Sequence, residues 1–79
     1  MTAEKFGAVM GILVPQVVQL IVEQQGRSET GATADFYASG VYALLEQEDT
    51  KLWHLSPLTL FHLFEEEQRT GSFELPEEV

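Results

Sequence analysis

KFGAVMGILVPQVVQLIVE, residues 5–23, is the stretch that decides the fold, because positions 6–22 within it form seventeen consecutive residues without a formal charge. Twelve of these seventeen residues are apolar. Some of them recur at spacings of four and three, which places them on one stripe of an α-helix. The members of this stripe are Phe6, Met10, Leu13, Val17 and Leu20. The pattern therefore predicts a long amphipathic helix.

The ends of this helix are marked by capping residues. Thr2 has the hydroxyl group that an N-cap needs, and Gly26 can adopt the left-handed conformation that follows many helices. We therefore expect the helix to run from about Thr2 to Gln25. Pro15 lacks an amide hydrogen, and its ring crowds the carbonyl group of Gly11. The helix is expected either to kink there or to divide into two short helices, with Pro15 in the first turn of the second.

An uncharged stretch of this length raises the question of a membrane. Seventeen helical residues rise about 25 Å, whereas the hydrocarbon layer is about 30 Å thick. The stretch also contains Gln16, Gln19 and Pro15, and its flanks lack the cluster of positive charge that anchors a spanning helix. The residues before it are electrically neutral apart from the amino terminus, unlike those of a secretory signal. We expect a cytoplasmic protein without a membrane partner.

The apolar surface of this helix exceeds what one side of a helix in a small domain can bury. A chain of 79 residues buries only about 60% of the surface of its unfolded state, and without cysteine it has no disulfide bonds to add stability. Association with another chain is the remaining common remedy. We expect a symmetric homodimer with the stripe Phe6, Met10, Leu13, Val17 and Leu20 at its interface. The alternative is a helix that its own fold covers on two sides.

A second helix is predicted from Ser28, which is a good N-cap, to about Gln47. Its expected buried face consists of Phe36, Tyr37, Val41, Leu44 and Leu45. Gly31 and Gly40 each weaken a helix by up to about 1 kcal/mol relative to alanine. We therefore also consider a break near Gly40, or the close approach of another helix there.

One more helix is predicted nearer the C-terminus. The segment TKLWHL at 50–55, which precedes it, is too short for a helix and suits an extended cover over the core. The last helix then begins with Ser56 as N-cap and Pro57 in the first turn, and it ends at Gly71. These are the most clearly marked helix ends in the chain.

The tail after this helix, SFELPEEV, is expected to be extended. Phe73 and Leu75 can pack against the core, and Pro76 ends any regular structure. We also consider a short pairing of the tail with residues 51–54. Taken together, the patterns predict a single, mainly α domain over the whole chain, with three to four helices, a long N-terminal helix and a short extended C-terminal tail.

The net charge of −9 is concentrated in the second half of the chain. Residues 1–39 carry four acids and two bases, whereas residues 40–79 carry nine acids and two bases. Four lysine and arginine residues scattered over the chain cannot form the basic patch that nucleic-acid binding needs. We therefore expect no binding to DNA or RNA, and a basic protein is the partner that suits the acidic half.

The histidines and the acidic run are the candidate chemical groups. His62 lies four residues before Glu66 on the last helix, and together with His54 these residues could form a metal site. No recognised metal-binding spacing is present, and an exposed pair is the simpler interpretation. The run Glu65, Glu66 and Glu67 is expected to face solvent. The chain also lacks cysteine and a glycine-rich phosphate loop, so we expect no catalytic residues, no metal and no cofactor.

A longer pattern occupies residues 36–78, and its elements in order are F-Y, Y-x-L-L-E, T-K-L-W-H-x-S, L-F-x-E-E and T-G-x-x-x-x-P-E-E. This half of the chain resembles a group of small uncharacterised proteins of Gram-positive gut and soil bacteria. The N-terminal helix is similar to theirs only in character. The resemblance implies no activity and no catalytic residues, and it implies an association with toxin-like genes.

Within this pattern Trp53 is flanked by two leucines and is a candidate binding anchor, although a tryptophan that closes a small core is the simpler interpretation. We predict partner-binding roles for Trp53, His54, Glu65 and Glu66. The expected function is that of a non-enzymatic, acidic protein-interaction module, in its sharpest form an antitoxin-like or operon-partner inhibitor. The alternative is a small metal-binding protein or metal-dependent enzyme that uses His54, His62 and Glu66.

Overall fold

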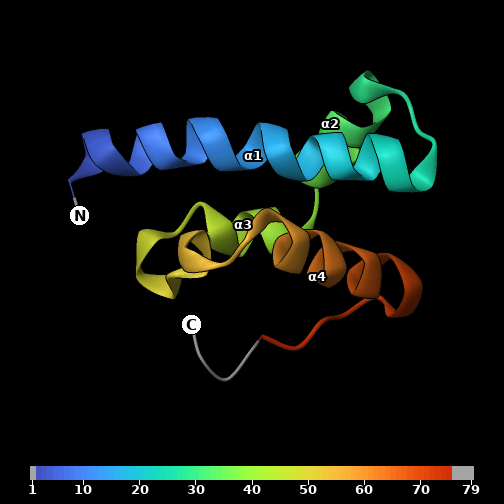
Figure 1. The fold of residues 1–79 in the computed structure, drawn as a ribbon. Helices are drawn as coiled ribbons and strands as arrows, with labels where there is room; N and C mark the ends of the chain where they lie inside the picture. Colours follow the sequence, from blue (N-terminus) through green and yellow to red (C-terminus); the bar gives the residue numbers. More distant parts are fainter. Residues whose placement is uncertain (1, 76–79) are drawn as a thin grey trace.

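The computed structural model describes residues 2–75. Within that range the chain forms four α-helices, two 3₁₀ turns and no strand, which confirms the mainly α fold class. In chain order the elements are α1 (Ala3–Gln25), α2 (Glu29–Tyr37), α3 (Gly40–Leu45), η1 (Glu48–Thr50), η2 (Leu52–His54) and α4 (Pro57–Thr70). Figure 1 shows α1 as one layer, with α3 and α4 side by side in a second layer beneath it.

α1 begins and ends where its capping residues predict. The Thr2 hydroxyl oxygen accepts a hydrogen bond from the amide of Lys5 at 3.2 Å, and Gly26 is left-handed with φ 64°. The helix runs unbroken through Pro15, so the predicted division into two short helices is wrong. Pro15 lies on the exposed side of α1, where water can bond the carbonyl group of Gly11 that the proline leaves without a donor.

The buried side of α1 is broader than the predicted stripe. Leu13 and Val17 are buried in the chain's own core, but Phe6, Met10 and Leu20 are only half-buried. The other buried residues of the helix are Val14, Val18 and Ile21. Because α2 and α4 both pack on α1, its C-terminal half buries two adjacent stripes. Over residues 13–21 the chain's own fold therefore covers this helix on two sides.

The predicted second helix is divided in two. α2 ends at Tyr37 and α3 begins at Gly40, so one helix to Gln47 is wrong and the alternative of a break near Gly40 is confirmed. The change of direction brings three side chains fully into the core, namely Phe36, Val41 and Leu45. A straight helix would point the first of these away from the other two, because five residues correspond to about 140° of rotation.

Two residues of the expected buried face are not fully buried. Tyr37 is 50% exposed, because the break turns the end of α2 outward. Leu44 of α3 packs against the core but is only half-buried. The ring of Tyr37 instead meets that of Tyr42 edge-on, with centroids 4.7 Å apart. Tyr42 in turn meets Phe36 edge-on at 5.7 Å. The aromatic rings therefore bridge the break between α2 and α3.

The segment at 50–55, for which the sequence predicts an extended conformation, contains 3₁₀ turns instead. The Thr50 hydroxyl group lies 2.8 Å from the carbonyl oxygens of both Leu44 and Gln47, to which it can donate. Side-chain hydrogen bonds of this kind compete with extended structure. Leu52 is nevertheless fully buried, in agreement with the expectation that this segment packs over the core.

α4 has the ends that its capping residues predict. The Ser56 hydroxyl oxygen accepts a hydrogen bond from the amide of Thr59 at 3.1 Å, and Gly71 ends the helix with φ 83°. The buried residues of α4 are Leu60, Phe61, Leu63 and Phe64. This helix therefore supplies the layer of the core that faces α1 and α3.

The tail folds back on α4, so its pairing with the segment before α4 is wrong for the described residues. The amide of Glu74 donates a hydrogen bond to the Glu66 carboxylate at 2.7 Å. Phe73 is half-buried against the core, whereas Leu75 is 44% exposed. Pro76 lies outside the described residues.

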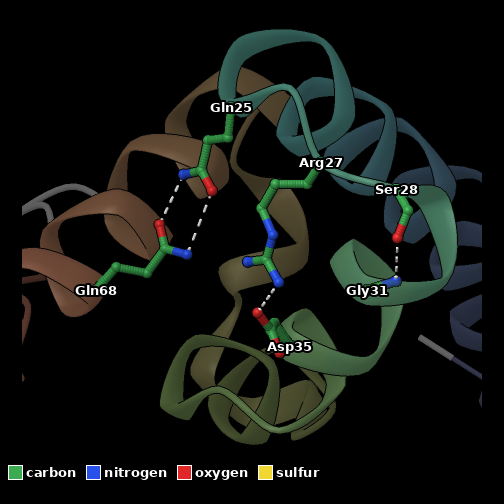
Figure 2. Close-up of polar contacts among 6 residues, drawn as sticks. All are labelled: Gln25, Arg27, Ser28, Gly31, Asp35 and Gln68. Carbon is green, nitrogen blue, oxygen red and sulfur yellow. Dashed lines mark hydrogen bonds and ion pairs between the residues drawn. The ribbon is translucent and has the colours of Figure 1, made fainter.

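Polar contacts fasten the loop between α1 and α2 (Figure 2). The side-chain amides of Gln25 and Gln68 exchange two hydrogen bonds, at 2.7 and 3.4 Å, which join the C-terminal ends of α1 and α4. Arg27 forms an ion pair with Asp35 of α2. Ser28 caps α2 with its hydroxyl oxygen, as predicted. Exposed contacts of this kind contribute little energy individually, but together they fix where α2 leaves α1.

Among residues 2–75, α1 is the one helix that is long and apolar enough to cross a membrane. Its most apolar window has a mean hydropathy of 1.7, and 28% of that window is buried within the chain. A core helix of a soluble protein has the same composition, so the absence of a membrane partner stays a prediction. The structure shows that much of the uncharged surface of α1 is not covered by the rest of the described chain.

The core around α4 allows a matched test of burial. Leu60 is fully buried, whereas Leu58 in the same helix is 51% exposed. Leu60→Ala is expected to lower the free energy of unfolding by about 2–5 kcal/mol, because it removes buried methyl groups and leaves a cavity. Leu58→Ala is expected to change it by less than about 1 kcal/mol. Urea unfolding followed by circular dichroism measures both, and equal losses would contradict the assigned core.

Candidate functional site

Trp53, the predicted binding anchor, is held by three contacts within the chain. Its indole nitrogen donates a hydrogen bond to the carbonyl oxygen of Glu48 at 2.9 Å. Its ring meets those of Phe6 and His54 edge-on, with centroids 6.5 and 3.9 Å away. Trp53 is therefore half-buried, and it fastens the N-terminal part of α1 to the turn before α4. A partner-binding role for this residue stays a prediction.

The other three predicted binding residues, His54, Glu65 and Glu66, lie on two different elements. His54 is exposed beside Trp53 in η2, whereas Glu65 and Glu66 are half-buried on α4. Glu66 holds the tail through the amide of Glu74. No described hydrogen bond or ring contact joins the η2 pair to the two glutamates. The structure therefore does not assemble the four residues into one site.

The metal-binding alternative has no assembled site in the described part of the chain. Among residues 2–75, no three His, Asp or Glu side chains lie close enough together to hold a metal ion. His54, His62 and Glu66 are therefore not brought together as ligands. His62 is exposed, and its ring lies tilted beside that of Phe61 at 5.9 Å.

Glu67 has a position that the acidic run does not predict. The run predicts a solvated side chain, but the two carboxylate oxygens of Glu67 accept hydrogen bonds from the amides of Gly40 at 2.8 Å and Val41 at 3.1 Å. These amides lie at the start of α3, where a helix leaves donors without partners and favours negative charge. A side chain of α4 therefore caps α3 across 26 and 27 residues of sequence.

The sequence around Ser39 contains a local signal for this contact. The Ser39 hydroxyl group accepts from the amide of Tyr42 at 3.1 Å and donates to the carbonyl oxygen of Phe36 at 2.6 Å. Because the Ser39 hydroxyl oxygen serves the amide of Tyr42, the amides of Gly40 and Val41, which open α3, need an acceptor from elsewhere. Gly40 admits that acceptor closely, since a Cβ atom there would lie 3.1 Å from a Glu67 carboxylate oxygen.

Of the shallow hollows beside α2, two also involve a neighbouring helix. One, of about 310 Å³, lies between α1 and α2 and is lined by Val14, Pro15, Val18, Gln19, Glu29, Thr33 and Tyr37. The other, of about 250 Å³, lies beside the break and is lined by Asp35, Ala38, Ser39, Phe64, Glu67 and Gln68. The second hollow is acidic, but Asp35 is paired with Arg27 and Glu67 bonds two amides. Its carboxylates therefore stabilise the fold.

Burial raises the pKa of Tyr42 above its ordinary value of about 10, and the nearby Tyr37 and Glu46 raise that pKa further. The phenol group is consequently neutral at physiological pH. Tyr42 therefore acts there as a packing residue between Phe36 and Tyr37 and not as a base.

Comparison of the chain with protein-family models, with curated proteins and with solved structures gave no match. The resemblance to small proteins of Gram-positive bacteria therefore stays a prediction.

Removing the Glu67 cap is expected to destabilise the domain. Glu67→Ala leaves two backbone amides without their acceptor and is expected to lower the free energy of unfolding by about 1–3 kcal/mol. Glu67→Gln keeps one oxygen acceptor and is expected to lose about half as much. The control Glu65→Ala, on the same helix, is expected to change it by less than about 0.5 kcal/mol. Urea unfolding at neutral pH measures all three, and similar values would contradict the cap.

The raised pKa of Tyr42 predicts a loss of stability at alkaline pH. A phenol whose pKa is higher in the folded state makes its full contribution below the ordinary pKa of about 10, and that contribution is lost as the pH rises through the folded-state pKa. Between about pH 8 and pH 12 the free energy of unfolding should therefore fall more steeply in the wild type than in Tyr42→Phe. Urea titrations at several pH values give both curves, and parallel curves would contradict the shift.

Proposed function

We propose that this chain is a non-enzymatic protein-interaction module, and that the layer formed by α3, the two 3₁₀ turns, α4 and the tail binds a basic protein. The observation that supports the proposal is the separation of charge between the two layers of Figure 1. Residues 2–25, which form α1 and its N-cap, carry two acids and one base, a net charge of −1. Residues 40–75 carry seven acids and two bases, a net charge of −5.

The acidic layer presents carboxylates to solvent. Glu46, Asp49 and Glu74 are exposed, whereas Glu66 and Glu67 are engaged by backbone amides. A surface with one sign of charge attracts a partner of the opposite sign, increases the rate of association and disfavours partners of like charge. The charge of this layer therefore favours a basic protein and disfavours nucleic acid.

In its sharpest form, the proposed module is an antitoxin-like or operon-partner inhibitor. A chain of 8.9 kDa with a compact helical layer suits a protein that acts by covering the surface of another protein. His54, exposed at the η2 end of this layer, and Glu65 on α4 are then additional contact residues.

The proposal is tested by affinity purification of the tagged chain from its organism of origin. A variant carrying Glu46→Gln, Asp49→Asn and Glu74→Gln loses three exposed charges but keeps the Glu67 contact and the serine and threonine N-caps described above. The wild type is expected to enrich one protein rich in lysine and arginine, identified by mass spectrometry. Isothermal titration calorimetry with that protein is expected to show about tenfold weaker binding by the variant, because three attractive charges are lost.

A matched control carries Glu4→Gln and Glu29→Gln, on α1 and α2. It removes acids outside the acidic layer and is expected to bind as the wild type does. The recovery of no protein by the wild type would contradict the proposal. Equal binding by the wild type and the triple variant would also contradict it.

A further inference from the structure

A continuous strip of exposed residues runs along α1, opposite its buried side. This α1 outer strip consists of Lys5, Ala8, Ile12, Gln16, Gln19 and Glu23, all of which are exposed. Their spacings of three and four place them on one side of a helix. Ile12, near the middle, is 65% exposed and is the largest apolar side chain of the strip.

The α1 outer strip has one charge at each end, and the two charges are of opposite sign. Lys5 and Glu23 are eighteen residues apart, which equals five helical turns, so they lie on the same side of α1. The distance between them along the helix axis is about 27 Å. The strip between them, from position 6 to position 22, carries no charge.

We propose that two copies of this chain associate through their α1 outer strips in an antiparallel arrangement. This arrangement places Lys5 of each copy beside the partner's Glu23, and two-fold symmetry creates the contact twice. The register is centred on position 14, so Ile12 of each copy lies against the partner's Gln16. A parallel arrangement would instead place like charges together at both ends of the strip.

Charge favours a second copy over the other occupants of this surface. Two copies with a net charge of −9 repel each other, and the repulsion is weakest along an uncharged helix side. A basic protein would meet a single acid, Glu23, on the α1 outer strip. A lipid surface would meet one lysine and two glutamines, and not the several basic residues typical of a helix that lies on a membrane.

The size of the contact predicts a weak, reversible dimer. A helix contact of about 27 Å buries less than the roughly 1,200–2,000 Å² of stable complexes. We therefore expect a Kd between about 10 μM and 1 mM. The surface differs from the interface predicted from the sequence, because Leu13 and Val17 of that stripe are buried in the monomer. It is also separate from the acidic layer, so the inference does not depend on the proposed function.

Sedimentation equilibrium of charge-reversal variants tests the arrangement. The mass of the wild type should rise from 8.9 kDa toward about twice that value as the concentration increases to about 1 mM. Lys5→Glu and Glu23→Lys should each weaken association about tenfold, since each places like charges together twice. The double variant restores opposite charges and should return the Kd to within about twofold of the wild type. Ile12→Glu should abolish the dimer.

Two controls separate the arrangement from general effects. Glu29→Lys changes the net charge as Glu23→Lys does but lies outside the α1 outer strip, so it should not weaken association. Vesicles of phosphatidylcholine, with and without phosphatidylglycerol, should leave the chain unbound in flotation. A mass of 8.9 kDa at all concentrations would overturn the proposal. Binding to vesicles through Ile12, or a dimer unaffected by both single charge reversals, would also overturn it.

Discussion

The arrangement of this fold depends on one contact between α3 and α4. In this contact the Glu67 carboxylate accepts hydrogen bonds from the two amides that open α3. The core requires Phe36 and Val41 on the same side, and a straight helix points them in different directions. The chain therefore breaks at Ser39, and the break leaves amides at the start of α3 without partners. Glu67 supplies the acceptor and thereby holds α3 against α4.

The position of α1 follows from this arrangement. α2 and α4 together form the surface on which the C-terminal half of α1 packs, which uses residues 13–21. In a chain of 79 residues no described element remains to cover the opposite side. The division of the molecule into an acidic layer and an uncharged helix side results from the same packing. The basic partner that we propose for one surface and the second copy that we propose for the other are both inferred from that division.

Sequence reasoning predicted the features that depend on neighbouring residues. Thr2, Ser28 and Ser56 cap their helices, and Gly71 ends α4, because each of these interactions lies within one helical turn. Contacts between distant segments were not predictable in the same way. The buried side of α1 depends on two helices that pack on it, and the role of Glu67 depends on a contact across 27 residues.

The central claim is that the Glu67 carboxylate holds the first amides of α3. The most direct test is the hydrogen exchange of the Gly40 and Val41 amides, measured residue by residue by nuclear magnetic resonance. The first amides of a helix have no partner within that helix and normally exchange rapidly. If Glu67 holds them as described, their protection should approach that of amides in the middle of α4. Rapid exchange of both amides, while α4 stays protected, would show that α3 is not fastened by this carboxylate and would contradict the account.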